Sequence, residues 1–133
     1  MSSQRDLVAL RNTYQVLLEE VNRLTLVYTD LNRSIETLET FKKLKEKGET
    51  APVMVPVGGF LSVIMDGIRV DKVAVQVGAG IYVEMPPEEA LEELKKRLEE
   101  VKENILKMQV ELRQIEAQLI SAERVGGAKK GTS

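Results

Sequence analysis

Two long stretches of this sequence repeat apolar residues at alternating intervals of three and four positions. In the first stretch these residues are Leu7, Leu10, Tyr14, Leu17, Val21, Leu24, Tyr28, Leu31, Ile35 and Leu38. In the second they are Leu91, Leu94, Leu98, Val101, Ile105, Met108, Leu112, Ile115, Leu119 and Ala122. A heptad repeat sustained over this length is typical of a coiled-coil seam, since its apolar stripe is narrower than that of a globular-surface helix. Each helix is expected to have about 39 residues and to be roughly 58 Å long.

The residues around the two repeats indicate where the helices end. A lysine-rich turn and Gly48 follow the first repeat and suit a helix C-terminus. Pro86-Pro87 and two glutamates precede the second repeat and suit a helix start. That repeat continues to Gly126, after which the polar, glycine-rich tail is expected to be disordered. The predicted parts are a helix over 1–47, a β region over 48–86, a helix over 87–125 and a tail over 126–133.

The first half of the β region predicts a β-hairpin without charged residues. Residues 53–65 contain no charge, and Gly58-Gly59 separates two apolar runs. Two glycines at this place predict a two-residue hairpin turn. Asp66-Gly67 and Asp71-Lys72 follow and are expected to form the link to the next element.

The second half predicts another hairpin. Residues 73–77 and 81–85 alternate apolar and other side chains with a period of two, as half-buried strands do. Gly78-Ala79-Gly80 joins them and supplies glycine where a positive φ is needed. The same glycines do not form a phosphate-binding loop, because a strand follows them rather than a helix N-terminus.

Neither hairpin is expected to be stable by itself. An isolated two-stranded hairpin is marginal in water, and an uncharged run needs cover on both faces. The heptad seams are narrow and are used by the two helices for each other, so we expect the helices to provide little cover. Other copies or other subunits should then bury the hairpins. The residues expected to carry this oligomerisation are Val53, Val55, Val57, Phe60, Val73, Val75, Ile81 and Val83.

The fold predicted from these patterns is α+β, a long antiparallel coiled-coil hairpin with two β-hairpins inserted at its base. The hairpins can return the chain to its starting point, which favours antiparallel helices. A register with Leu38 beside Leu91 sets two attractive charge pairs and one repulsive pair on the edges of the seam. The attractive pairs are Arg11 with Glu123 and Glu39 with Lys95, and the repulsive pair is Glu20 with Glu111.

Composition excludes several classes of function. The chain has no cysteine and no histidine, so it lacks thiolate chemistry and the commonest general base and metal ligand. Its net charge of -2 gives no strong attraction to nucleic acid or to an anionic membrane. Its many glutamates alternate with lysines, as on a solvated helix face. We therefore expect a cytoplasmic protein that is not an enzyme and has no cofactor, metal, nucleic-acid or membrane partner.

The two hairpin sequences resemble those of the prefoldin family. The resemblance lies in VMVPVGGFLSV, residues 53–63, and in DKVAVQVGAGIYVEM, residues 71–85. Two hairpins rather than one are typical of the α-type subunit of archaeal prefoldin. The chain departs from the family at LSVIMDGI, residues 61–68, where a shorter run is common.

The resemblance implies an ATP-independent chaperone of six chains. Two α-type and four β-type subunits would join their hairpins in an intersubunit β-barrel, and the coiled coils would extend from it. The tips would hold unfolded polypeptides and deliver them to a group II chaperonin. The alternative is a self-assembling α-like relative that forms filaments, or a structural coiled-coil adaptor, without client transfer.

Capture of unfolded chains needs apolar groups at the helix ends that the seam does not use. The candidates are Leu7, Val8, Leu10, Val16, Leu18, Leu119 and Ile120. Seam residues near a terminus become exposed when the last turn, which lacks hydrogen-bond partners, frays. Ordinary scattered surface apolar residues are the alternative interpretation.

Overall fold

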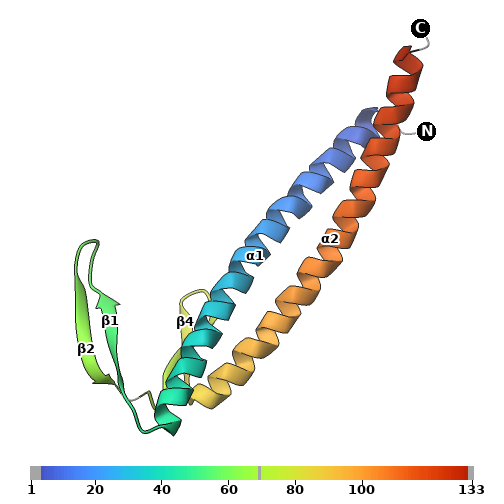
Figure 1. Cartoon of the computed structure of the whole chain (residues 1–133). Helices are drawn as coiled ribbons and strands as arrows, with labels where there is room; N and C mark the ends of the chain where they lie inside the picture. The colour runs from blue at the N-terminus through green and yellow to red at the C-terminus, as the bar shows by residue number, and fades with distance from the viewer. Residues whose placement is uncertain (1–3, 69, 132–133) are drawn as a thin grey trace. The chain divides into compact units, whose positions relative to one another are not determined.

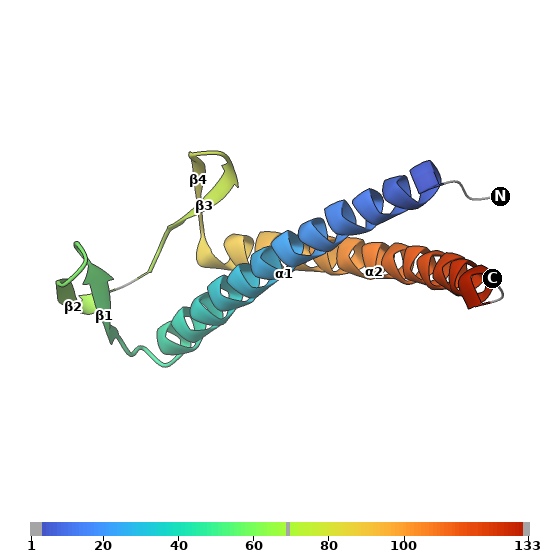
Figure 2. The ribbon, with the colours of Figure 1, turned by 90° about the horizontal axis from the view of Figure 1, so that it is seen from above.

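The computed structural model describes residues 4–68 and 70–131, and side chains within these ranges except those of 68 and 125–131. Its elements, labelled in Figures 1 and 2, are α1 (Gln4–Glu46), β1 (Ala51–Pro56), β2 (Ser62–Ile68), β3 (Val73–Gly78), β4 (Ile81–Met85) and α2 (Pro87–Gly131). The chain divides into two compact units. Met1–Thr29 with Glu99–Ser133 form one, here called the terminal unit, and Asp30–Leu98 form the other, here called the hairpin unit. The predicted α+β fold of two helices and two antiparallel hairpins is confirmed.

The end of α1 follows from the glycine beyond it. Gly48 has a φ of 67°, a left-handed conformation that other residues adopt at a cost. The Gly48 amide donates to the Lys45 carbonyl oxygen at 3.1 Å, and the Glu49 amide donates to the Leu44 carbonyl oxygen at 2.9 Å. These two bonds form a Schellman motif, which satisfies carbonyls that the helix end leaves open. The predicted stop at Gly48 is confirmed.

The two ends of α2 compare differently with the sequence prediction. Pro87 opens the helix as expected, and the Ala90 amide donates to the Pro86 carbonyl oxygen at 3.0 Å. At the other end α2 continues to Gly131, whereas the sequence predicted a helix end near 125 and a disordered tail. Glycine costs a helix about 1 kcal/mol relative to alanine but does not forbid it. Residues 132–133 lie outside the described residues.

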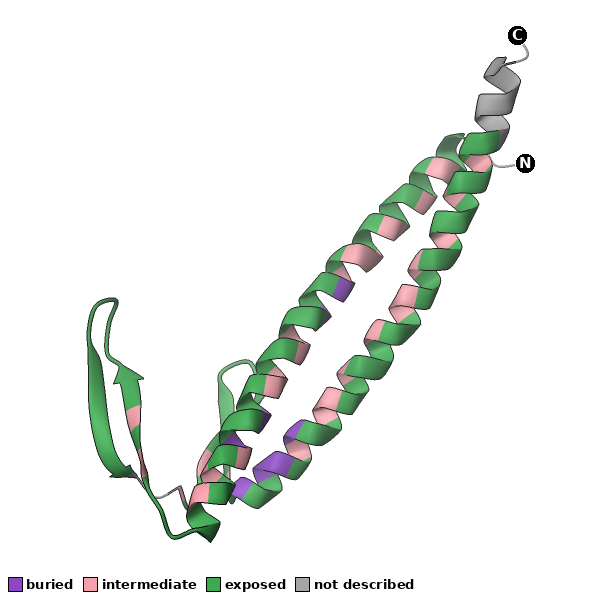
Figure 3. Ribbon diagram, viewed as in Figure 1, coloured by how far each residue is buried: buried purple, intermediate pink, exposed green. Residues whose placement is uncertain are grey.

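In each unit, α1 and α2 run side by side in opposite directions and pack through the heptad residues (Figure 1). Val21 and Leu24 are buried in the terminal unit, and Ile35, Leu38 and Leu91 are among those buried in the hairpin unit. Most other heptad residues are half-buried, because two helices alone leave both edges of their seam open. Figure 3 shows the buried positions on the facing sides of the helices.

The β1–β2 hairpin is antiparallel, with Val53 opposite Met65 and Val55 opposite Val63. The sequence prediction of a two-residue Gly-Gly turn was wrong. The connection spans residues 57–61, and the Val57 amide closes it by donating to the Leu61 carbonyl oxygen at 2.9 Å. The pairs of the two strands end at Pro56 and Ser62, and the Val57–Leu61 bond beyond them leaves Gly58, Gly59 and Phe60 as the tip of the loop.

Asp66-Gly67 also differs from its predicted place in the link. Both residues lie inside β2, where the register shifts by one residue between the pairs Val53–Met65 and Ala51–Ile68. Gly67 has a φ of 72°, the left-handed conformation that a glycine bulge requires. The dipeptide therefore bends a strand instead of ending it.

The β3–β4 hairpin pairs Val73 with Met85 and Val75 with Val83. Gly80 in its turn has a φ of 75°, which confirms the expectation of glycine at a positive φ. Only Pro86 separates β4 from α2, so the strand leads directly into the first turn of the helix (Figure 2).

One apolar cluster joins this hairpin to both helices of the hairpin unit. Its buried members are Ile35, Leu38, Val75, Ala90, Leu91 and Leu94, and half-buried Leu31, Val73, Met85 and Leu98 pack against them. The expectation that the helices would not cover the hairpins was therefore wrong for one face of β3–β4. Near the start of α2 the seam is open on the side of the strands, so Val75 completes it.

Candidate assembly and client-binding surfaces

Both faces of the β1–β2 hairpin are apolar and open to solvent. Val53 is half-buried, whereas Val55 on the same face is exposed together with its cross-strand neighbour Val63. Met54 and Ile64 pair on the opposite face and are 67% and 65% exposed. Figure 3 shows this hairpin as exposed over nearly its whole length. Apolar surface on two faces of one hairpin is typical of a strand pair that another chain covers.

The loop of the same hairpin carries two of the predicted assembly residues. Phe60 is fully exposed, and Val57 is exposed beside it. The other described apolar residue of the loop, Leu61, is exposed as well. An aromatic side chain without cover at a hairpin tip offers a large apolar anchor for a partner.

The β3–β4 hairpin divides its apolar face between two environments. Val73 and Val75 lie at the helix end of this face and belong to the cluster with the helices. Val83, opposite Val75, is exposed, and so are Val77 and Ile81 next to the turn. Of the predicted assembly residues in this hairpin, Val75 is thus buried within the chain, and Ile81 and Val83 are free for another chain.

The predicted client-binding residues all lie in the terminal unit, near the N-terminal end of α1 and the C-terminal part of α2. Val8, Val16 and Ile120 are exposed. The half-buried members of the set are Leu7, Leu10, Leu18 and Leu119. Arg11 and Glu123 join the two helix ends through an ion pair of 3.6 Å between Nη2 and Oε1.

Two further kinds of site were sought in the described part of the chain. Among the described residues, no group of three or more acidic side chains could hold a metal ion. No helix in the described part of the chain is long and apolar enough to cross a membrane.

Comparison with known proteins places this arrangement in a family. The model of the prefoldin subunit family matches residues 10–127, which include both hairpins and most of each helix. The chain belongs to the prefoldin family. It is similar to the prefoldin α subunit of Methanococcoides burtonii, with 33% identity over 124 residues that make up 92% of this chain and 90% of the relative. It is also 36% identical to the prefoldin α subunit of Pyrococcus horikoshii over 107 residues, or 79% and 70% of the two chains.

A solved structure supports the same assignment. The chain is similar to a cryo-EM structure of filamentous PFD from Methanocaldococcus jannaschii, with a TM-score of 0.68 and 26% identity. The match covers 92% of this chain and 98% of the other. The chain is thus an archaeal-like α-type prefoldin, and prefoldin is a chaperone family rather than an enzyme family.

The register of the prefoldin helices agrees with the charge pairs expected from the sequence. Besides Arg11–Glu123, Lys95 Nζ lies 3.3 Å from Glu39 Oε1. These pairs lie in the terminal and the hairpin unit respectively, so the same register holds in both. Exposed pairs of this kind are worth tenths of a kcal/mol, and they select the register more than they stabilise it.

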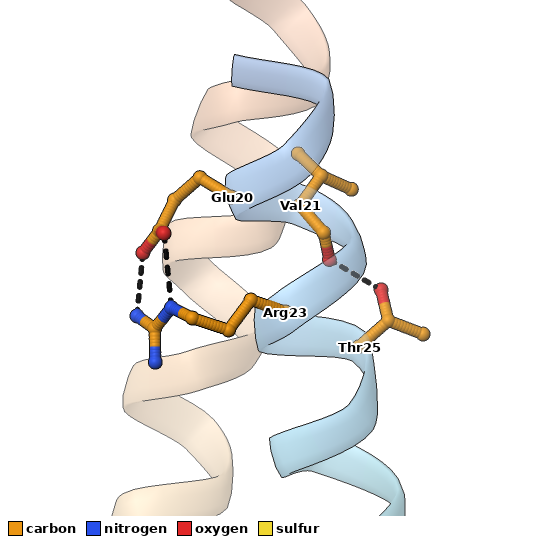
Figure 4. A network of polar contacts seen from close by, with 4 residues as sticks. All are labelled: Glu20, Val21, Arg23 and Thr25. Carbon is orange, nitrogen blue, oxygen red and sulfur yellow. Dashed lines mark hydrogen bonds and ion pairs between the residues drawn. The ribbon is translucent and has the colours of Figure 1, made fainter. Parts of the chain in front are cut away.

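The one repulsion expected in this register has a partner that relieves it. Arg23 donates from Nε to Glu20 Oε2 at 2.9 Å and makes a second bond to Glu20 Oε1 (Figure 4). The hydrogen bond from Arg23 lowers the pKa of Glu20 below its usual 4.5. A neighbour one helical turn away thus neutralises the carboxylate that was expected to oppose Glu111.

Sequence reasoning missed two features of the prefoldin hairpins. It did not include Met54 and Ile64 in the assembly surface, although alternation alone places them together on the second face of β1–β2. It also missed Arg97, whose Nη1 donates to the Gln76 carbonyl oxygen at 2.6 Å. No pattern in the sequence indicates this second contact, since a backbone acceptor is the same at every residue.

Proposed function

We propose that this prefoldin is a subunit of an ATP-independent chaperone that assembles through its hairpins and holds unfolded polypeptides at the ends of its helices. The observation that carries the proposal is the pair of exposed apolar faces on β1–β2, with exposed Phe60 at the tip. Such a surface on a highly charged chain is stable in water only when another chain covers it. Joined hairpins of several subunits would form the intersubunit β-barrel expected above.

The client-binding part of the proposal depends on the exposed apolar residues near the helix ends. Val8, Val16 and Ile120 give each subunit a small apolar surface with weak affinity for an extended chain. Several subunits of one assembly would bind the same client jointly, because a client held at one site is at a high effective concentration for the other sites. Delivery of that client to a group II chaperonin is the expected next step.

The test of client binding compares two sets of three exposed aliphatic residues. The first variant changes the terminal set, Val8, Val16 and Ile120, to serine. The control changes Leu26, Leu106 and Val110, which lie outside the heptad seam away from the helix ends, to serine. The two sets are matched, with exposures of 43–65% and 50–69%. The readout is light scattering from a chemically unfolded client diluted into buffer.

We expect the terminal variant to lose most of its suppression of aggregation and the control variant to keep it. Equal suppression by both variants would remove the terminal surface as the client site. A labelled client bound to the assembly and then offered to a purified group II chaperonin tests delivery. A client that stays on the assembly would leave a holding function without transfer.

The test of assembly is Phe60→Asp, measured as mass by light scattering. Phe60 is fully exposed, so the change should leave the fold of the subunit intact and prevent its assembly. Lys72→Gln, at an exposed position between the hairpins, is the control, because it lowers the net charge by one unit as Phe60→Asp does. A Phe60→Asp chain with the parent mass would count against hairpin assembly.

A filament is the second candidate, and the similarity to filamentous PFD favours it. A subunit whose open sheet edges do not close into a barrel continues to add copies of itself. Assemblies of variable length from this chain alone, seen by electron microscopy, would support the filament. The barrel would be supported by a discrete complex of about six chains that forms only when a β-type partner is added. The family resemblance implies two α-type and four β-type subunits in such a complex.

A further inference from the structure

The two hairpins differ in how they attach to the helices. The β1–β2 hairpin is joined to α1 by residues 47–50 and to β3 by residues 69–72. β4, in contrast, reaches α2 through Pro86 alone, and α2 opens on Pro87. Proline fixes φ near −65°, so this junction has little backbone freedom. The covalent path from β4 into α2 is therefore short and stiff.

Two non-covalent contacts add to this junction. Val75 lies in the apolar cluster with Leu91 and Leu94 of α2. Arg97, about one turn further along α2 than Leu94, donates from Nη1 to the Gln76 carbonyl oxygen at 2.6 Å. A hydrogen bond from a charged donor is stronger than a neutral one. The apolar contact acts at one point on β3, and the polar contact acts at the next residue.

Arg97 is itself held in place by its own helix. Its Nε lies 3.2 Å from Glu93 Oε1, one turn back on α2, and its side chain is half-buried. The planar guanidinium presents donors in fixed directions, so the bond to Glu93 orients the other arm toward Gln76. Lysine, with a single flexible ammonium group, would not give the same orientation.

We propose that Arg97 is the positioning residue that holds the β3–β4 hairpin in one orientation on α2, before any partner chain binds. The exposed strand of this face, with Ile81 and Val83 of β4, then meets a partner at a preset angle to the helices. This consequence rests on the proposed assembly function, whereas the positioning itself does not. A hairpin that is already held in one orientation loses less conformational entropy when the chains assemble.

A distance measurement within one chain tests the positioning. The chain has no cysteine, so Ala79→Cys in the hairpin turn and Glu92→Cys on the exposed side of α2 take spin labels at chosen sites. Labelled full-length chain is measured at a dilution at which its mass by light scattering is that of a single chain, so that distances within a free subunit are read. Arg97→Gln is the test variant, and Arg113→Gln, an exposed arginine on the same helix, is the control.

The expected result is a narrow distance distribution in the parent and the control and a clearly broader one in Arg97→Gln. Arg97→Lys should be broader than the parent and narrower than Arg97→Gln. Amide exchange in β3 should be faster by about tenfold in Arg97→Gln, as for the loss of one charge-assisted hydrogen bond. Helical circular dichroism should stay at the parent level, which separates loss of positioning from unfolding.

An Arg97→Gln distribution as narrow as that of the parent would overturn the proposal. Broadening in Val75→Ala together with an unchanged Arg97→Gln would overturn it as well, and would assign the positioning to apolar packing. These outcomes are independent of the assembly test. If Phe60→Asp leaves the mass unchanged, the proposed assembly fails while the distance result stands. If Arg97→Gln leaves the distance distribution unchanged, the positioning role fails while the assembly result stands.

Discussion

Leu94→Ala should destabilise the subunit strongly, because Leu94 lies where the two helices and the β3–β4 hairpin share one cluster. Its side chain is 8% exposed, and the cluster includes Leu38 of α1, Leu91 of α2 and Val75 of β3. Removal of three carbon atoms at about 0.8 kcal/mol each gives a transfer loss of about 2.4 kcal/mol. The cavity adds to it, and buried Leu→Ala changes cost roughly 2–5 kcal/mol in all.

The neighbours of Leu94 in the cluster place the expected loss of stability for Leu94→Ala in the lower half of that range. Val73 and Met85 pack against the cluster but are only half-buried, so they can move into the space that Leu94 leaves. We expect a loss of about 2–3 kcal/mol in the free energy of unfolding. The matched control is Leu26→Ala, since Leu26 is 69% exposed and outside the seam. Its cost should be about 0.5 kcal/mol or less, as for ordinary surface changes.

The assay is urea unfolding followed by helical circular dichroism, at one fixed chain concentration because assembly raises apparent stability. With a slope of about 1–3 kcal/mol per molar urea, the Leu94→Ala midpoint should fall by about 1 M. The Leu26→Ala midpoint should stay near that of the parent. Equal shifts for both variants would refute the argument that a local cluster of the hairpin unit, rather than general helix stability, carries the fold.

Three further perturbations follow from the polar contacts and the backbone. Arg23→Gln should raise the pKa of Glu20 back toward 4.5, measured by carboxyl-carbon NMR, because the Arg23 hydrogen bond holds it below that value. A carboxyl group whose pKa is lowered in the folded state stabilises the fold fully above about pH 4.5, and this stabilisation is lost as the pH falls through the folded pKa. The Arg23→Gln variant should therefore be less stable than the parent at pH 7. A difference in stability that is unchanged at pH 2 would contradict this. Arg11→Glu should lower the melting temperature slightly, and Glu123→Arg should restore it in the double variant, with a coupling of about 0.2–1 kcal/mol that 1 M salt removes. An unrestored double variant would argue against the contact between the helix ends. Gly67→Ala should speed amide exchange in β2, because alanine at a φ of 72° costs about 1 kcal/mol; parent-like exchange would mean that the bulge tolerates a side chain.

Much of this structure could be predicted from short-range patterns. Spacings of three and four indicated both helices, and the edge charges that such spacing implies gave the register that the Arg11–Glu123 and Glu39–Lys95 pairs confirm. Gly48 and Gly80 were correctly predicted at positive φ or at a helix end, since a missing Cβ has the same consequence in any fold. These features depend on residues close in sequence or on a repeat that runs the length of a helix.

The errors concern contacts that no local pattern specifies. Gly58-Gly59 and Asp66-Gly67 are both compatible with a turn, and the cross-strand register decided that one lies in a longer loop and the other in a bulge. The client-binding residues remain a prediction, because exposure at the helix ends is compatible with binding and with ordinary surface.

The sequence by itself determined that this chain has two matched heptad helices and two hairpins with glycines in or near their turns. Only the tertiary structure decided that the hairpins are unequal, with β3–β4 docked on the chain's own helices and both faces of β1–β2 left open. The reason is physical. The periodicity of a sequence indicates which side chains need burial but not which residues will cover them. For β3–β4 that cover depends on the short connection through Pro86 to α2 and on the Gln76 carbonyl oxygen that lies within reach of Arg97.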